Sequence, residues 1–330
     1  MTEALDLIIV GAGPCGIAVG AAARSGGLSA KLIDEGCVTS SLVNYPYYMT
    51  FFSTAEKLEI DGVPFTIAES KPTRREALAY YRRVVRHYDL DIHQYEEVIG
   101  ITGEAGDFTV LTRKRDGDEH RYSASAVVVA TGSFHQPNYL GVPGENLPKV
   151  LHYYREPYPF FDQDVVVVGG GNSAVESALE TFRGNARVTL VHFTEKLDRG
   201  VKPWVVPDIE NRLEKGEIPV FWRHRVAEIL PGSVVLRDDD TGKTTEIKND
   251  WVLAMTGWQA DPGFLGGLGV GIDPETGIPR HDPTSMETNV SGVYIAGVLA
   301  AGHNANKIFI ENGKLHGGLI VQHLCSSAGP

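Results

Sequence analysis

Two glycine-rich stretches have the composition and spacing of turns that hold a dinucleotide. The first reads GAGPCG at residues 11–16, and the second reads GGGNSA at residues 169–174. In such a turn glycine lets the backbone approach a pyrophosphate, and the N–H groups that open the following helix point at its charge. We therefore expect two dinucleotide sites. Their candidate ligands are Gly11, Gly13, Pro14, Cys15 and Gly16 in the first turn and Gly169, Gly171, Asn172, Ser173 and Ala174 in the second.

The first turn has the surroundings that such a site needs. An apolar run at 7–10 precedes it, an alanine-rich periodic stretch follows it, and a second apolar run at 30–33 ends at Asp34. This order predicts a strand, a glycine turn, a helix and a strand. The carboxylate of Asp34 can accept hydrogen bonds from two ribose hydroxyls. Glu35 is the competing candidate, because the pattern places the end of a strand only to within a residue or two.

The second turn leads to a different residue type at the end of the next strand. The apolar run at 188–191 ends at His192, and no carboxylate follows until Glu195. A carboxylate would repel a 2′-phosphate, whereas histidine, lysine and arginine can bind it. The pattern favours NADPH over NADH, and the alternative is an ordinary basic surface loop. The basic residues of this stretch are His192, Lys196, Arg199 and Lys202, of which we expect His192 and Arg199 to contact the coenzyme.

The composition of the chain indicates its class and its surroundings. Its 330 residues are 42% hydrophobic and 22% charged, as in a soluble protein of two domains. A net charge of −12 argues against nucleic acid as a partner. Three cysteines are too few for a disulfide framework, so we expect a cytoplasmic location. No apolar run reaches the roughly 18 residues of a membrane helix, and the start lacks the basic segment of an export signal.

Both halves of the chain follow the same plan. In each half a strand, glycine turn, helix and strand are followed by a hairpin and by a strand that leads into a threonine-glycine pair. Each half is then a parallel βαβ sheet that carries an antiparallel meander. The elements predicted outside the two turns are helices at 73–87 and 308–324, strands at 126–129, 251–254 and 292–296, and hairpins around 116–117 and 238–242.

Four motifs resemble the low-molecular-weight thioredoxin reductases, which are flavoproteins with two dinucleotide sites. These are GAGPCG at 11–16, VVVATG at 127–132, VVVVGGGNSAVE at 165–176 and GVYIAG at 292–297, in the order and spacing of that family. The resemblance implies an α/β fold with two Rossmann-like, three-layer ββα domains. It also implies FAD at the first turn and NADPH at the second. The FAD domain would comprise residues 1–145 and 258–330, and the NADPH domain residues 146–257.

Two departures narrow the resemblance. A thioredoxin reductase carries a Cys-x-x-Cys pair in its NADPH domain, but no cysteine stands between Cys37 and Cys325 here. In addition, Val298 stands where the family usually has an aspartate.

The stretches NYPYYMTFFST at 44–54 and AGVLAAGHNANKIFIENGKLHGG at 296–318 resemble the bacillithiol-disulfide reductases. Those enzymes use FAD and NADPH to split the disulfide of a small thiol. The resemblance implies this activity, with a small-molecule partner, and further FAD contacts at Asn44, Val98, Thr131, Gly132, Gly297, Val298 and Ile308. We expect no membrane partner and a homo-oligomer, either a dimer or a tetramer.

Cys15 has two interpretations. It stands at the start of the first predicted helix, where N–H groups stabilise a thiolate, although a bound pyrophosphate opposes this effect. A small, half-polar side chain also packs well between a helix and a sheet. The resemblance implies that Cys15 is the catalytic nucleophile, with the flavin resolving the mixed disulfide because no second thiol is near. His303 and His316 are candidates for donating a proton to the leaving thiolate, or are hydrogen-bonded scaffold.

Three other functions share parts of this pattern. Flavin monooxygenases have two dinucleotide turns, but in their linker signature Phe and Gly precede a histidine, and Asn146 and Pro148 stand there before His152. A ferredoxin–NADP reductase of this fold also lacks a cysteine pair, but an acidic chain suits acidic ferredoxins poorly. A non-enzymatic flavin-binding redox sensor is the third. Fast NADPH consumption with a disulfide would separate the reductase from such a sensor.

Overall fold

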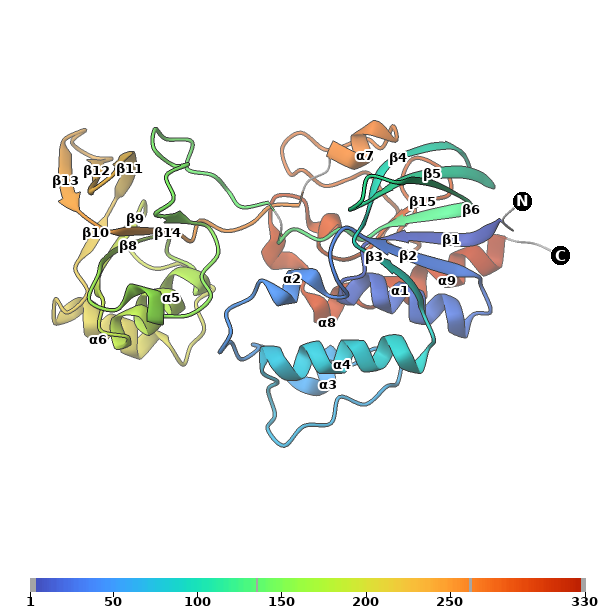
Figure 1. Cartoon of the computed structure of the whole chain (residues 1–330), viewed down its shortest axis with the longest axis horizontal. Coiled ribbons are helices and arrows are strands. Elements are labelled where there is room, and N and C mark those ends of the chain that lie inside the picture. The colour runs from blue at the N-terminus through green and yellow to red at the C-terminus, as the bar shows by residue number, and fades with distance from the viewer. Residues whose placement is uncertain (1–3, 135, 261–262, 328–330) are drawn as a thin grey trace. The chain divides into compact units, whose positions relative to one another are not determined.

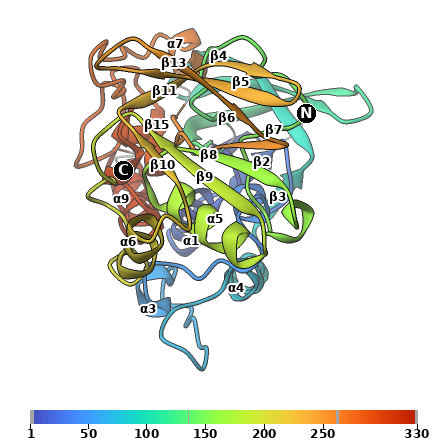
Figure 2. The ribbon, with the colours of Figure 1, turned by 90° about the vertical axis from the view of Figure 1, so that its left-hand side faces the viewer.

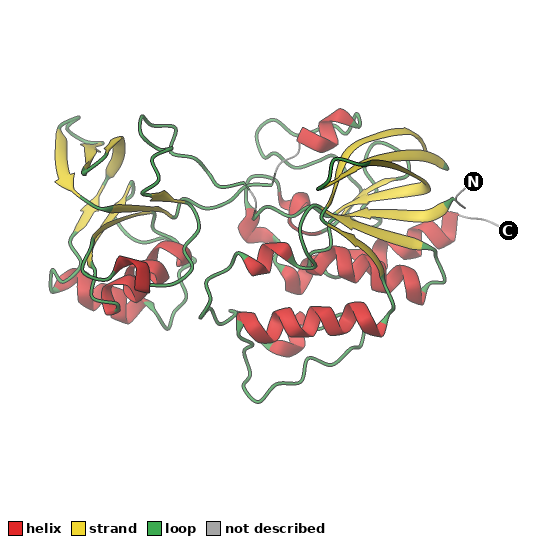
Figure 3. Ribbon diagram, in the orientation of Figure 1, coloured by secondary structure: helices red, strands yellow, loops and turns green. Residues whose placement is uncertain are grey.

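The chain divides into two compact units (Figure 1). The structure is a computed structural model that describes residues 4–134, 136–260 and 263–327. Figure 3 shows that each unit contains both helices and strands. Unit 1 comprises Met1–Val43, Thr50–Gln136 and Gln259–Pro330, and unit 2 comprises Asn44–Met49 and Pro137–Trp258.

The boundaries of unit 2 follow from its packing and hydrogen bonds. Residues 137–145, which the sequence places with the first half, join unit 2 because Leu140 and Val142 pack against its buried core. Residues 44–49 join it because the backbone N–H of Tyr47 donates to the carbonyl oxygen of Arg155 at 2.9 Å. Unit 2 therefore includes a short segment from early in the chain.

Unit 1 is built on a seven-stranded sheet. In the central strand of its parallel part the consecutive apolar residues Leu7, Ile8 and Ile9 are fully buried, as expected for a strand covered on both faces. In Figure 1, β4 and β5 lie at the upper end of the sheet, farther from α1 and α9 than β1 and β2 are. The strand order is β3 (Asp91–Gln94), β2 (Ala30–Asp34), β1 (Leu5–Val10), β6 (Glu119–Val129), β5 (Asp107–Lys114) and β4 (Glu96–Glu104), and β15 (Val293–Ile295) also pairs with β6.

The helices of unit 1 pack around α1, which follows the first glycine turn. α1 (Pro14–Ser25) contacts both α4 (Arg74–His87) and α9 (His316–Ser327). α4 begins with a capping box, in which Thr73 and Glu76 each accept a hydrogen bond from the backbone of the other. The short helices are α2 (Ser40–Val43), α3 (Ala55–Leu58), α7 (Gly263–Gly267), α8 (Ile310–Gly313), η2 (Gly297–Ala301) and η3 (Ala305–Lys307).

Two predicted elements of unit 1 were wrong in their extent. The second strand of the hairpin around 116–117 and the strand predicted at 126–129 form one strand, β6. Its first part pairs antiparallel with β5, and its later part pairs parallel with β1 and β15. The single helix at 308–324 is two helices, α8 and α9. Lys314 and Leu315 separate them. Gly313, the last residue of α8, is enclosed by Cys15, Gly297 and Ile308, where a Cβ would lie 3.0–3.1 Å from an atom of each.

Unit 2 has three layers. Figure 2 shows α5 and α6 on one side of a parallel sheet and the small antiparallel sheet on the other. The parallel sheet has the order β10 (Val220–Trp222), β9 (Arg187–His192), β8 (Asp164–Val168), β14 (Trp251–Ala254) and β7 (Val150–Leu151), and the antiparallel sheet has the order β11 (His224–Leu230), β12 (Ser233–Asp238) and β13 (Thr244–Lys248). The helices are α5 (Asn172–Arg183), α6 (Val206–Glu214) and η1 (Tyr158–Phe160).

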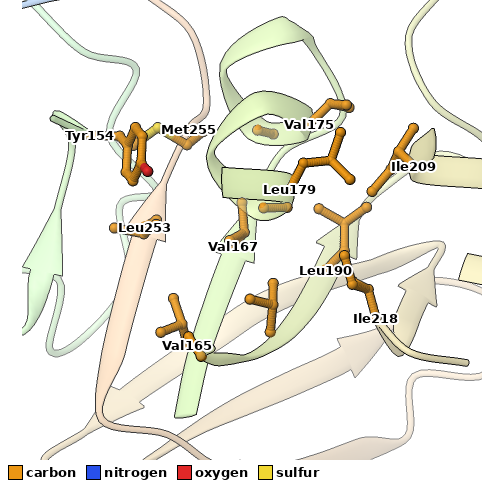
Figure 4. Packing of buried hydrophobic residues seen from close by; sticks show 14 of the residues in the cluster. Tyr154, Val165, Val167, Val175, Leu179, Leu190, Ile209, Ile218, Leu253 and Met255 are labelled. Atoms are coloured by element: carbon orange, nitrogen blue, oxygen red, sulfur yellow. The ribbon is translucent and has the colours of Figure 1, made fainter. Parts of the chain in front are cut away.

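Alternate residues of β8 fill two cores in unit 2. Val165 and Val167 face the helices, where they pack with Leu190, Leu179 and Ile209 (Figure 4). Val166 and Val168 face the antiparallel sheet and pack with the cluster that includes Val226, Ile229 and Leu236. This alternation fixes the register of β8 and so the place of the glycine turn that follows it. Among the described residues, no helix is both long and apolar enough to cross a membrane.

Candidate active site

The first glycine turn leaves open space in front of α1. Gly11 has a φ of +107°, and a Cβ there would lie 2.5 Å from the carbonyl oxygen of Ala130. A Cβ on Gly16 would overlap the carbonyl oxygen of Gly11, so both residues must be glycine for the turn to close. Gly13, the N-cap of α1, has ordinary extended angles, and no atom lies within 4 Å of a Cβ placed on it. Pro14 follows at the first helical position, where its missing N–H costs nothing. The open face of Gly13 fits a pyrophosphate.

Asp34 braces the first turn from the end of β2. Its side chain is buried, and its carboxylate accepts hydrogen bonds from the N–H of Ala12 at 2.7 Å and of Gly36 at 2.8 Å. The neighbouring Glu35 is exposed. Asp34 therefore holds the turn in shape, and Glu35 is the carboxylate that faces solvent beside it.

Cys15 is packed against glycine. Its Sγ lies where a Cβ on Gly297 or on Gly313 would come within 3.0 Å, so both glycines make room for the sulfur. Burial raises the pKa of the Cys15 thiol to about 12, and at neutral pH the side chain is a thiol. The described cysteines Cys15, Cys37 and Cys325 are all free, and Cys325 is exposed.

A half-buried histidine, His316, fixes the backbone next to Cys15. The N–H of Gly297 donates to Nδ1 of His316 at 3.1 Å, at the start of η2. Burial, with a smaller contribution from His281, lowers the pKa of His316 to about 4. His316 is thus neutral at physiological pH, with the proton on Nε2. His303 is exposed, and its backbone N–H donates to the carbonyl oxygen of Thr276.

The second glycine turn repeats the backbone of the first. Gly169 has a φ of +137°, and a Cβ there would overlap the carbonyl oxygen of Met255, as Gly11 faces Ala130. Gly171 is the N-cap of α5, Ser173 is exposed, and Ala174 is buried. This turn differs in front of the helix, because a Cβ on Gly171 would lie 3.3 Å from Oδ2 of Asp198.

A loop that follows β9 is tied to the second turn. Asn172 donates from Nδ2 to the carbonyl oxygen of Gly200 at 2.8 Å and accepts at Oδ1 from the N–H of Lys202 at 2.8 Å. The ammonium group of Lys202 pairs with Glu176 of α5 at 2.7 Å. The side chains of Asn172 and Lys202 therefore hold residues 198–202, and Arg199 of this loop is exposed.

His192 ends β9 inside the protein. Burial lowers its pKa by more than the neighbouring Asp198 carboxylate, at 3.4 Å, raises it. Neither ring nitrogen makes a hydrogen bond of good geometry with any of the described residues. A neutral imidazole can donate one hydrogen bond to a phosphate but supplies no charge.

Two basic residues near this strand end were missed by sequence reasoning. The N–H of Arg223 donates to the carbonyl oxygen of Thr194 at 3.0 Å, and the guanidinium of Arg225 lies 4.6 Å over the ring of Phe193. Both follow β10, which pairs parallel with β9. Because the carboxyl ends of neighbouring parallel strands meet at one edge of a sheet, recognising 220–222 as a strand would have placed them here.

The remaining predicted cofactor contacts lie at separate places. Thr131 and Gly132 follow β6, and the backbone of Thr131 adjoins Gly11. Val98 lies in β4, half-buried, and Val298 lies in η2. Ile308 precedes α8 and contacts Gly313. Asn44 belongs to unit 2, where its Oδ1 accepts from Arg155 at 3.3 Å. In unit 1 the structure thus brings Gly11, Cys15, Thr131, Gly297 and Ile308 around the first turn.

The comparison with known families agrees with this geometry. The sequence pattern of the pyridine nucleotide-disulphide oxidoreductases matches residues 8–297. The chain belongs to this family. It is therefore a flavoprotein reductase that uses FAD and a pyridine nucleotide, and the expected thioredoxin-reductase-like fold is confirmed.

Similar proteins narrow the family further. The bacilliredoxin reductase of Bacillus subtilis (strain 168) is 44% identical over 317 residues, covering 96% of each chain. The structure of a bacillithiol disulfide reductase from Bacillus cereus is 43% identical, with a TM-score of 0.95, over 98% of this chain and 100% of that one. The corresponding structure from Staphylococcus aureus is 38% identical, with a TM-score of 0.93, over 99% and 100%. A ferredoxin–NADP reductase and a flavin-containing monooxygenase match at only 25% and 22% identity, so these alternatives are more distant.

Proposed function

We propose that the enzyme reduces bacillithiol disulfide to two molecules of bacillithiol, with NADPH as the source of electrons. The relatives named bacillithiol disulfide reductases support this substrate. The observation that carries the proposal is the set of cysteines, because Cys15, Cys37 and Cys325 form no Cys-x-x-Cys pair. The chain has no dithiol in unit 2 to relay electrons to a protein, which suits a small disulfide that reaches the flavin site itself.

The first turn is the proposed FAD site. The open face of Gly13 and the N–H groups that begin α1 would face the pyrophosphate, and the exposed Glu35 would accept hydrogen bonds from the ribose. Bound FAD would take a hydride from the pyridine nucleotide and supply the two electrons that a disulfide needs. Further proposed contacts with FAD are Asn44, Val98, Thr131, Gly132, Gly297, Val298 and Ile308.

The second turn is the proposed NADPH site. No carboxylate stands at the end of β9, and Arg199 is exposed on the loop that follows. His192 could donate one hydrogen bond there, while the positive charge for a 2′-phosphate would come from Arg199. Arg223 and Arg225 lie near the same strand end, where they pair with Asp240 and Asp239. Asn172 acts on the coenzyme only through the loop that it holds.

We propose that Cys15 attacks the substrate disulfide. Since burial raises its pKa to about 12, its proton must leave before attack. The sulfur of Cys15 then bonds to one sulfur of the disulfide, the S–S bond breaks, and one bacillithiol leaves as a thiolate. The two electrons that bound FAD would supply then break the S–S bond between Cys15 and the second bacillithiol. The second bacillithiol leaves as a thiolate, Cys15 is restored as a thiolate, and the thiolates take up protons from solvent. In the other interpretation Cys15 only fills the space beside Gly297 and Gly313, and the Cys15→Ala variant separates the two.

A second candidate substrate is an oxidised bacilliredoxin. It is favoured by one observation, the name of the 44% identical relative from Bacillus subtilis. The two candidate substrates both carry a disulfide, and they differ in size. A small disulfide needs only access to the first turn, whereas a protein disulfide also needs a docking surface.

Steady-state kinetics tests the proposal. The purified yellow protein is mixed with NADPH and with bacillithiol, glutathione or coenzyme A disulfide, oxidised bacilliredoxin, ferredoxin, or oxygen alone. We expect fast NADPH oxidation with bacillithiol disulfide and only background rates with the other small disulfides and ferredoxin. A preference for bacilliredoxin over the free disulfide would favour the second substrate, and a rate set by oxygen alone would overturn both.

We further propose a cytoplasmic location and a homo-oligomeric state. The three free cysteines suit a reducing compartment. Light scattering on the FAD-loaded protein at micromolar concentration should give the mass of a dimer or a tetramer, and a mass near 36 kDa would contradict the oligomer.

A further inference from the structure

We propose that Asp198 determines the affinity of the enzyme for its pyridine nucleotide, because its carboxylate stands where the pyrophosphate must approach the second turn. This inference rests on the proposed coenzyme site. The side chain of Asp198 is not a ligand of the coenzyme, and the coenzyme must displace it in order to bind. The comparison between the two turns of this chain carries the argument.

Gly13 and Gly171 occupy the same position in their turns, as the N-caps of α1 and α5. At such a glycine the backbone approaches the pyrophosphate. In front of Gly13 a Cβ would meet no atom within 4 Å, whereas in front of Gly171 it would meet Oδ2 of Asp198 at 3.3 Å. One turn is open, and the other has a carboxylate in the corresponding place.

The carboxylate is held there by its loop. The backbone N–H of Asp198 donates to the carbonyl oxygen of Gly170 at 3.0 Å, within the turn itself. On the other side of Asp198, Asn172 binds the backbone of Gly200 and of Lys202. These hydrogen bonds fix the backbone at Asp198 and after it. The carboxylate of Asp198 therefore lies at the start of α5 in a loop that is already ordered.

The charge of Asp198 is not neutralised by a fixed cation. Within the described part of the chain its ion-pair partner is His192, at 3.4 Å. Burial lowers the pKa of His192, so the imidazole is neutral at physiological pH. A carboxylate at the start of α5 is itself stabilised by the N–H groups there, as a phosphate would be. Asp198 therefore occupies the place of the pyrophosphate and repels it.

Binding measurements on FAD-loaded protein test this inference. The variant Asp198→Asn keeps the shape of the side chain and removes its charge. Glu210→Gln, on the exposed side of α6, removes a charge elsewhere on unit 2 and is the matched control. Calorimetric titration with NADP⁺, NAD⁺, ADP-ribose and 2′-AMP gives the dissociation constants without turnover. These four probes separate the pyrophosphate, which 2′-AMP lacks, from the 2′-phosphate, which NAD⁺ and ADP-ribose lack.

We expect Asp198→Asn to bind NADP⁺ and ADP-ribose about fivefold more tightly. This is the effect expected from removing one half-exposed negative charge about 4 Å from the pyrophosphate. Binding of 2′-AMP should not change, and Glu210→Gln should bind all probes like the original protein. Weaker or unchanged binding of ADP-ribose to Asp198→Asn would overturn the inference. Tighter ADP-ribose binding together with a preference of the original protein for NAD⁺ would instead contradict only the proposed NADPH specificity.

Discussion

The first glycine turn, at residues 11–16, and the second, at residues 169–174, share a backbone but differ in what surrounds it. Gly11 and Gly169 both have positive φ angles and face a carbonyl oxygen at the end of a neighbouring strand, that of Ala130 or of Met255. The same crowding therefore selects glycine at the first position of both turns. This likeness is a property of the βαβ unit and does not distinguish the two nucleotides.

The two turns differ first in the residue at their last position. A Cβ on Gly16 would overlap the carbonyl oxygen of Gly11, while unit 2 has Ala174 at the equivalent place. Helix α1 thus lies closer to its turn than α5 does. The residue at the strand end is the second difference. The carboxylate of Asp34 accepts from the N–H of Ala12, within its turn, and from that of Gly36, just after β2, whereas His192 makes no hydrogen bond of good geometry with the described residues. The first turn is held from the end of β2 and is open in front, whereas the second is held by the loop after β9 and has the Asp198 carboxylate in front of it.

The largest expected effect comes from exchanging the last residue of each turn for the residue that the other turn has, alanine for Gly16 and glycine for Ala174. Gly16→Ala should destabilise unit 1 by about 3 kcal/mol or more, since the overlap is with backbone that cannot move aside. Thermal unfolding and the FAD content of the purified protein measure it. The reverse change, Ala174→Gly, should cost only about 1 kcal/mol and leave the protein yellow. Equal effects of the two changes would mean that the turns are equally tight.

Cys15→Ala tests whether the first turn also carries the chemistry. If Cys15 attacks the disulfide, turnover should fall about a hundredfold or more, while FAD binding and reduction of the flavin by NADPH persist. Stopped-flow absorbance separates the two half-reactions, and Cys37→Ala is the control. Mass spectrometry after substoichiometric disulfide should locate an adduct on Cys15 alone. Full disulfide turnover in Cys15→Ala would leave Cys15 with a packing role beside Gly297 and Gly313.

A smaller effect is expected at the coenzyme end of the second turn. Arg199→Ala should lower kcat/KM for NADPH about tenfold and leave that for NADH unchanged, because only NADPH carries the 2′-phosphate. The exposed Lys243, in the hairpin between β12 and β13, provides the control variant Lys243→Ala. Equal losses with both coenzymes would place the 2′-phosphate elsewhere, with Arg223 and Arg225 as the next candidates.

The turns could be predicted from sequence because local rules determine them. Strands β1, β2, β8 and β9 each contain a short apolar run, and the glycines between strand and helix follow from the need for close backbone approach. The place of Asp198 could not be predicted, because it depends on hydrogen bonds between a loop without periodicity and Asn172. The break between α8 and α9 was missed because the apolar pattern of a single helix continues through it. The pattern predicts that Asp34 binds ribose, and only the structure reveals that its carboxylate accepts from the N–H of Ala12 in the turn and of Gly36 after β2.

The central claim is that each turn holds its own nucleotide, with FAD at the first and NADPH at the second. Alanine at Gly13 or at Gly171 tests it most directly, since both residues have backbone angles that alanine adopts and a Cβ at either faces the proposed pyrophosphate. Absorbance at the flavin band and NADP⁺ titration are measured on both variants. The account predicts a folded but colourless Gly13→Ala that still binds NADP⁺, and a yellow Gly171→Ala whose affinity for NADP⁺ is reduced. A yellow Gly13→Ala with normal flavin content, or loss of FAD from Gly171→Ala alone, would contradict it.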